Sequence, residues 1–140
     1  MKNQILKVIT FCYLLILVSC GDGVALEPPT SNRDYKNIIG IPIKSKIGNL
    51  EVTQYDFPEQ MNWLDAKKAC EALGEGWRLP TKDELNSMYV NKNTIGGFST
   101  NSYWSSSEMG NFVWNQYFNF GGREPDRRTN MNYVRAVKPL

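Results

Sequence analysis

The chain has 140 residues, with 16 basic and 14 acidic side chains, three cysteines and no histidine. This length suffices for one domain with a modest core. The absence of histidine removes the commonest general base, the commonest metal ligand and every Ser-His or Cys-His nucleophile. The near-balance of charge gives no overall argument for nucleic acid as a partner. We therefore expect a single domain that is neither a hydrolase nor a nucleic-acid-binding protein.

The amino terminus has the layout of a secretory signal peptide, predicted over residues 1–19. Two lysines precede an apolar run at residues 8–18, which at about 11 residues is short against the roughly 20 that span a bilayer. The run ends in Leu-Val-Ser-Cys-Gly at residues 17–21, which resembles the lipobox of bacterial lipoproteins. That resemblance implies that Cys20 is acylated and becomes the mature amino terminus. An ordinary signal peptide or a single membrane-spanning anchor is the alternative.

A lipid anchor at Cys20 predicts where the protein works. One acyl chain binds a membrane only marginally and two or more anchor it stably, so a multiply acylated, palmitate-bearing Cys20 would hold the domain in the bacterial cell envelope. We expect the outer membrane, on its periplasmic or its surface face. Loss of residues 1–19 removes Lys2 and Lys7 and no acid, which leaves 14 basic and 14 acidic side chains. The mature protein is formally neutral.

The cysteines predict no intramolecular disulfide. Cys12 leaves with the signal peptide, Cys20 is acylated, and Cys70 stands alone. Cys70 falls at an expected buried helical position, where an unpaired cysteine behaves as a small hydrophobe.

The mature chain divides into a tether and a domain. Residues 20–37 are rich in Gly, Pro, Ser, Asn and charge, which is typical of a flexible linker. Apolar residues return in the following segment, so we place the domain at residues 38–140. Residues 47–55 carry β-branched and aromatic side chains and predict a first strand.

Two helices are expected next. Asn62 can cap the first, which ends near Gly74 and Gly76. Its buried face comprises Trp63, Ala66, Cys70 and Leu73. The second begins with Thr81, and Glu84 three residues later gives the spacing of a capping box. Its buried stripe comprises Leu85, Met88 and Tyr89. Arg78, in the link between the helices, should point away from the core or find an acidic partner.

The remainder predicts strands. Between residues 112 and 120, Phe112, Trp114, Phe118 and Phe120 alternate with Val113, Asn115, Tyr117 and Asn119, which favours a half-buried antiparallel strand with an aromatic inner face. Glycines end this strand, residues 123–130 form a charged loop, and residues 133–138 supply a closing strand. Helices followed by strands indicate an α+β fold.

Three motifs resemble a known family. They are GWRLPTKDEL at residues 76–85, YWSSS at residues 103–107 and YVRAV at residues 133–137. With Trp63, Ala66 and Cys70 upstream, they resemble the Lcl C-terminal domain family, named for the terminal domain of a collagen-like bacterial adhesin, over roughly residues 50–140. The first motif is also similar to segments of the Fibrobacter major paralogous domain and of formylglycine-generating enzymes. The resemblance implies a C-type-lectin-like α+β domain with two helices and a small, mostly antiparallel sheet, and speaks more for fold than for activity.

Neither catalysis nor a metal is expected. Formylglycine-generating enzymes use late cysteines with copper, and no cysteine follows Cys70. Glu124 and Asp126 could in principle do acid/base work, but nothing in the sequence marks them as buried. Calcium-dependent lectins place a Glu-Pro-Asn loop before a Trp-Asn-Asp strand, and here Glu124-Pro125-Asp126 follows Trp114-Asn115-Gln116. A structural turn is the preferred interpretation, with calcium as the alternative.

The best candidates for ligand contact are Arg123, Arg127 and Arg128, since guanidinium groups grip sulfates and carboxylates bidentately. Tyr117 and Asn115, on the expected polar strand face, join them. The alternative is a solvated loop balanced by its own acids. The family adhesin is associated with sulfated glycosaminoglycans, which implies an anionic glycan as ligand. We expect a noncatalytic binding domain without cofactor; the alternative function is a protein-interaction module of an envelope complex.

Overall fold

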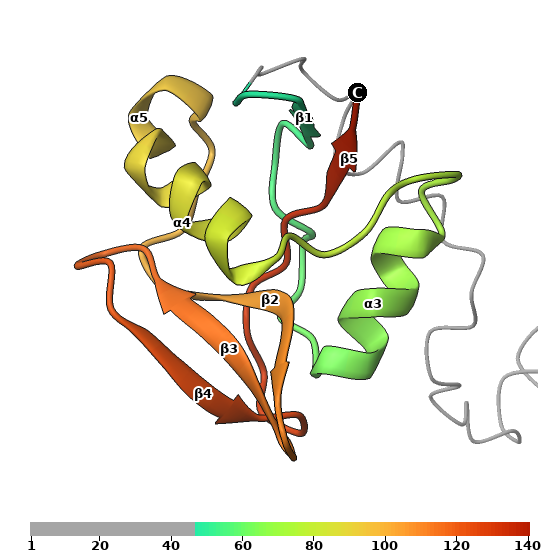
Figure 1. The fold of residues 1–140 in the computed structure, drawn as a ribbon, viewed down its shortest axis with the longest axis vertical. Helices are drawn as coiled ribbons and strands as arrows, with labels where there is room; N and C mark the ends of the chain where they lie inside the picture. Colours follow the sequence, from blue (N-terminus) through green and yellow to red (C-terminus); the bar gives the residue numbers. More distant parts are fainter. Residues whose placement is uncertain (1–46) are drawn as a thin grey trace, which may run out of the picture. The chain divides into compact units, whose positions relative to one another are not determined.

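The computed structural model describes residues 47–140 (Figure 1). The predicted signal peptide, Cys20, the tether and residues 38–46 lie outside the described residues. The elements in chain order are β1 (Leu50–Val52), α3 (Trp63–Glu71), α4 (Lys82–Val90), α5 (Lys92–Ile95), β2 (Ser102–Met109), β3 (Phe112–Tyr117), β4 (Arg123–Arg127) and β5 (Val137–Pro139). No helix in the described part is both long and apolar enough to cross a membrane.

The described strands form two antiparallel sheets. One holds β1 and β5, and the other has the order β2-β3-β4, so β4 is an edge strand. The first strand was predicted over residues 47–55 and the closing strand over residues 133–138, and both are shorter in the structure, where they are β1 and β5. Residues 133–136 precede β5 as an extended segment whose carbonyls accept hydrogen bonds from Trp104, Phe57 and Thr53. This segment therefore bonds to β2 and to the residues that follow β1, and it does not extend the β1–β5 ladder.

Both predicted helix starts are confirmed. The Asn62 side chain accepts a hydrogen bond from the Asp65 amide at 3.1 Å. At the second helix the Glu84 amide donates to Thr81 Oγ1 at 3.2 Å, and the Thr81 amide donates to Glu84 Oε2 at 2.8 Å, which completes the capping box. Arg78 finds the expected acidic partner in Glu84 at 2.7 Å. Such caps depend on residues three positions apart, so the local sequence suffices to predict them.

A third, short helix was not predicted. α5 follows α4 after Asn91, whose carbonyl accepts from the amides of Thr94 and Ile95. The helix lasts for four residues before Gly96 ends it with φ at 76°.

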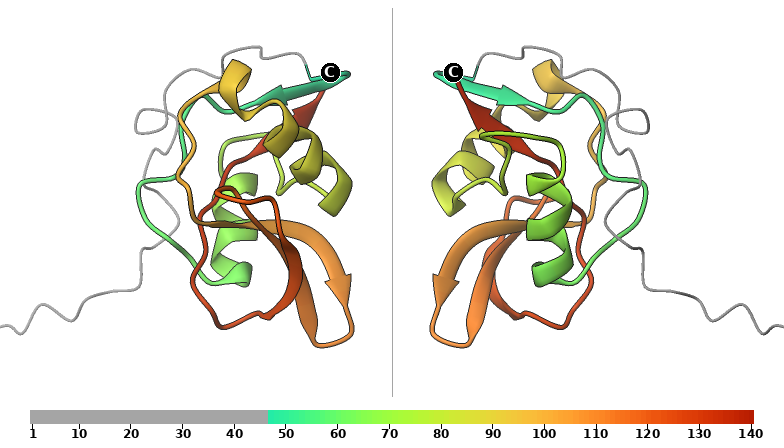
Figure 2. Two further views of the ribbon diagram at one scale, coloured as in Figure 1. Left: turned by 90° about the vertical axis from the view of Figure 1, so that its left-hand side faces the viewer. Right: turned by 90° about the vertical axis from the view of Figure 1, so that its right-hand side faces the viewer.

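The three-stranded sheet lies between α3 and α4, each of which packs on one of its faces (Figure 2). The face toward α3, here called the α3 face, carries Trp104 and Val113 and packs against Trp63, Ala66 and Cys70. The opposite face, here called the α4 face, carries Tyr103, which packs with Leu85 and Met88. Because both faces are partly covered, neither is uniformly polar.

The predicted facing of β3 was wrong. Val113 and Asn115 are buried at 0% and 1% exposure, whereas Phe112 is 42% exposed. The strand also ends at Tyr117, so Phe118 and Phe120 lie outside its alternation, and Phe120 is 67% exposed. The spacing of the aromatic residues predicted the wrong inner face, because it is Val113 that packs in the core with the residues of α3.

Candidate ligand-binding face

Residues 123–127, predicted as part of a loop, form the edge strand β4. Gly121, with φ at 83°, makes the turn from β3, and residues 123–127 then pair antiparallel with residues 112–116. Pro125 sits in the middle of β4, a position that an edge strand tolerates because one of its sides makes no ladder hydrogen bonds. Pairing with β3 therefore corrects the loop prediction and gives each charged side chain a defined face.

Strand alternation separates the charges of β4 by sign. Arg123 and Arg127 lie opposite Gln116 and Phe112, which places both guanidinium groups on the α4 face. Both arginines are exposed, and neither forms an ion pair with another described residue. Four residues of extended strand separate them by about 13 Å. Although β4 contains two basic and two acidic residues, its two cations thus lie together on one face.

The acids of β4 point to the α3 face. Asp126 accepts hydrogen bonds from the side-chain amides of Asn130 at 2.6 Å, Asn132 at 3.0 Å and Asn115 at 3.3 Å, and from the Arg127 backbone amide at 2.8 Å. A carboxylate surrounded by N–H donors is arranged as a structural acceptor and not as a ligand for a cation. Within residues 47–140 no cluster of three His, Cys, Asp or Glu side chains is placed to hold a metal ion.

Glu124 and Tyr117 lie together near the exposed end of the hairpin formed by β3 and β4. The neighbouring Glu124 carboxylate raises the pKa of the Tyr117 hydroxyl above its ordinary value. Tyr117 also stacks on Phe120, with ring centroids 5.2 Å apart. Glu124 itself is exposed. Tyr117 is half-buried, and it lies on the face opposite Arg123.

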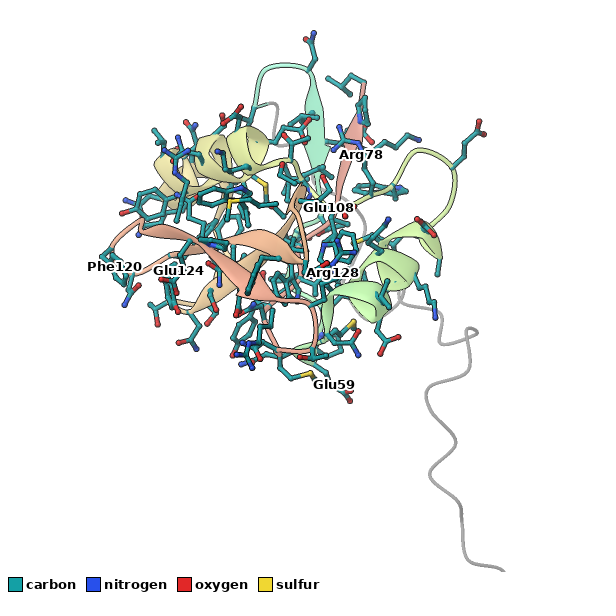
Figure 3. The ribbon with its side chains drawn as sticks, turned by 60° about the horizontal axis from the view of Figure 1, so that its bottom comes forward. Glu59, Arg78, Glu108, Phe120, Glu124 and Arg128 are labelled. Atoms are coloured by element: carbon teal, nitrogen blue, oxygen red, sulfur yellow. The ribbon has the colours of Figure 1, made fainter. Side chains whose placement is uncertain are left out.

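Arg128 has a structural role, because its side chain and backbone join two parts of the domain. Its guanidinium bonds Glu108 Oε2 at 2.5 Å and the Gly110 carbonyl at 3.1 Å, and lies over the Trp63 ring at 4.7 Å (Figure 3). Its backbone carbonyl accepts from the Trp63 amide at 3.0 Å. These contacts tie the turn between β2 and β3 to the start of α3.

The five predicted contact residues are thus not brought together. Arg123 and Arg127 share the α4 face, Tyr117 and Asn115 belong to the α3 face, and Arg128 lies beyond β4 against α3. Asn115 in particular is 1% exposed, because its amide reaches Asp126 beneath the strand. The expectation that Asn115 lies on an exposed polar face is therefore corrected.

Other residues on the α4 face escaped sequence reasoning. Lys82, at the start of α4, places its ammonium 4.3 Å from the centroid of the Trp114 ring. Phe112 and Met109, paired across β3 and β2, are 42% and 46% exposed. The i, i+2 spacing of Phe112 and Trp114 signals that they share a face, but only the packing of α4 reveals that Lys82 joins them.

Among residues 47–140 the most deeply buried charged side chain is that of Arg135, which sequence reasoning also missed. Its Nε donates to Asp56 Oδ1 at 2.8 Å and its Nη1 to the Thr53 carbonyl at 2.7 Å. Its guanidinium also lies 4.0 Å from the centroid of the Phe98 ring. Asp56 additionally accepts from the Tyr103 hydroxyl. These groups join segments far apart in the sequence, and we assign them a structural role.

The serines and the cysteine also have structural roles. Ser105 Oγ donates to the Trp114 carbonyl at 2.6 Å, Ser106 Oγ donates to the Pro80 carbonyl at 3.3 Å, and Ser107 Oγ accepts from the Lys82 amide at 2.9 Å. Cys70 is buried, as predicted, and burial raises the pKa of its thiol. A protonated, inaccessible thiol is a poor nucleophile.

Known proteins resemble the chain in fold. The crystal structure of botrocetin matches it at 14% identity with a TM-score of 0.51. A chain from the complex of botrocetin with a mutant von Willebrand factor A1 domain matches at 11% identity with a TM-score of 0.52. Each match covers 72% of this chain and 100% of the other. The C-type-lectin-like α+β fold is thereby confirmed. No curated protein matches the sequence. The Lcl C-terminal domain family matches residues 44–138, the region that contains all three motifs, and the chain belongs to this family.

Proposed function

We propose that the protein is a lipoprotein of the bacterial cell envelope whose domain binds an anionic glycan through the α4 face. The observation that carries this proposal is the charge separation along β4, which leaves Arg123 and Arg127 exposed and unpaired within the described chain. Family membership and the lectin-like fold favour a noncatalytic binding domain. The lipobox-like sequence at residues 17–21 supplies the anchor.

Local charge is essential to this proposal because the mature chain is formally neutral. The acids around the hairpin are engaged or directed elsewhere: Arg128 pairs with Glu108, side-chain amides surround Asp126, and Glu124 projects from the opposite face of β4. The two arginines of β4 therefore face solvent without local neutralisation. Spaced guanidinium groups on a strand suit a ligand with repeated sulfates or carboxylates.

The test is binding of the purified protein to a glycan panel that includes sulfated polysaccharides, with added salt and with chelator. The variant R123Q/R127Q should abolish most of the affinity. K68E is the matched control, because Lys68 is exposed on α3 and the substitution changes the net charge by the same two units. Equal affinity for R123Q/R127Q and the parent protein would refute the assignment, and loss on chelation would indicate calcium instead.

A protein partner is the second candidate function. Met109 and Phe112 are exposed next to Arg127, and aromatic, Met and Arg side chains are enriched in protein interfaces. One botrocetin neighbour was solved in a complex with a protein domain. Under this alternative, capture from envelope membranes would depend on Phe112 and Met109, and glycans would neither bind nor compete.

A further inference from the structure

The α4 face carries a short aromatic strip in addition to its arginines. Phe112 and Trp114 are two residues apart on β3, so their side chains project about 7 Å apart on the same face. Pro125 lies directly across from Trp114 on β4 and is exposed. Arg127 and Arg123 mark the two ends of this strip. Apolar ring surfaces and cations thus alternate along one side of the sheet.

Lys82 belongs to the same surface although it comes from a helix. Its backbone amide donates to Ser107 Oγ at 2.9 Å, which fixes the start of α4 against β2. Its ammonium then lies over Trp114, at 4.3 Å from the ring centroid. No described carboxylate pairs with this ammonium. The helix therefore delivers a third cation between the two arginines of β4.

The contact between Lys82 and Trp114 is of a kind that a ligand can replace. A cation–π contact at an exposed site is weaker than a charge-assisted hydrogen bond between an ammonium and an anion. An arriving sulfate or carboxylate therefore offers Lys82 a better partner than the ring. Movement of the flexible lysine side chain toward that anion would uncover more of the indole face.

We propose that Lys82 and Trp114 form a saccharide subsite within the α4 face. A sulfate or carboxylate on one sugar residue takes the Lys82 ammonium, and the apolar face of that sugar or of its neighbour stacks on Trp114. The subsite rests on the proposed function, since it uses the same face, and it adds selectivity. An anionic polysaccharide offers both the charge and the apolar ring surface, whereas a polyanion without sugar rings offers the charge alone.

The test compares three polyanions at equal charge concentration and ionic strength: dextran sulfate, inorganic polyphosphate and poly-L-glutamate. We expect the full-length protein to bind dextran sulfate most tightly. W114L should weaken dextran sulfate binding roughly threefold to tenfold, because a lost ring contact has about that effect, and should leave polyphosphate binding nearly unchanged. W114F, which keeps an aromatic face, should retain most of the affinity.

The variant K82Q provides a second measurement that does not alter the strand. It should weaken binding of dextran sulfate more than K68Q does, because Lys68 is exposed on α3 away from this face. Circular dichroism establishes whether W114L is folded. If it is not, the affinities of W114F and K82Q and the relative affinities of the three polyanions test the subsite.

The outcomes distinguish failure of the subsite alone from failure of the proposed function. If polyphosphate binds as tightly as dextran sulfate and W114L changes neither, the subsite is refuted while anion binding through the arginines stands. If poly-L-glutamate binds as tightly as dextran sulfate and depends on Trp114, the face recognises acidic protein instead of saccharide. If no polyanion binds, both proposals fail.

Discussion

Breaking the buried ion pair between Asp56 and Arg135 should strongly destabilise the domain. The Arg135 side chain is 0% exposed and that of Asp56 is 13% exposed. Removing one partner of a buried pair typically costs about 3–5 kcal/mol, because the remaining charge stays in a low-dielectric interior. In D56A the carbonyls of Thr53 and Gly97 would still accept from Arg135. We therefore expect the lower end of that range, about 3 kcal/mol.

This loss is large relative to the stability of so small a domain. The described part has 94 residues, 47–140, for which an unfolding free energy of about 5–14 kcal/mol is typical. A loss of about 3 kcal/mol corresponds to a fall in Tm of roughly 12–24 °C. Urea denaturation, followed by tryptophan fluorescence, measures the free energy directly, and thermal unfolding gives Tm.

An exposed ion pair supplies the control. Arg128 and Glu108 have side chains that are 33% and 49% exposed, so E108A should cost no more than about 1 kcal/mol. The double replacement D56L/R135M removes both charges together and should recover much of the loss seen in D56A. A cost below about 1 kcal/mol for D56A would show that the pair is solvated and that our assignment of a structural role is wrong.

Four further outcomes are expected. E84Q should reduce the unfolding free energy by about 1 kcal/mol at pH 7 and have little effect in acid, because Arg78 holds the pKa of Glu84 below its ordinary value of 4.5. That stabilisation is complete above pH 4.5 and is lost as pH falls through the folded-state pKa, so a pH-independent effect would contradict it. Gly121→Ala should cost roughly 1–3 kcal/mol more than Gly110→Ala, since both have positive φ but only at Gly121 does a ring lie 2.6 Å from the added Cβ; equal Tm values would contradict this. C20S should release the protein from the membrane fraction and abolish labelling by palmitate, and persistence in that fraction would contradict a lipid anchor. Cys70 should react with a thiol reagent only at the rate of unfolding, because it is fully buried; rapid labelling under native conditions would contradict its burial.

The parts of the fold that depend on near neighbours in sequence could be predicted. Asn62 and Thr81 each accept a hydrogen bond from the backbone amide three residues ahead, so the spacing of residue types carries the information. The family motifs then identified the lectin-like fold, which the structural comparisons confirm. The local sequence was also sufficient to place Cys70 in the core.

The parts that depend on distant partners could not be predicted. Pro125 and its charged neighbours indicated a loop, yet pairing with β3 makes them a strand. Asn115 is buried because Asp126 accepts from its amide. Arg135 is buried because Asp56, 79 positions away, neutralises it. In each case a residue takes a position that its own chemistry disfavours, and the partner that holds it there comes from elsewhere in the chain.

The pairing of β1 with β5 determines how the domain can be held in an experiment. Leu140 donates its backbone amide to the Asn49 carbonyl at 2.9 Å, so the beginning and the end of the described chain lie together (Figure 1). Figures 1 and 2 place this end of the molecule opposite the tip of the hairpin formed by β2 and β3. Immobilising the protein through Asn49 or Leu140 leaves that tip, with Met109 and Phe112, directed toward the solution. A surface coupled at residue 140 would therefore hold the β1–β5 end of the domain and leave the β2–β3 tip accessible.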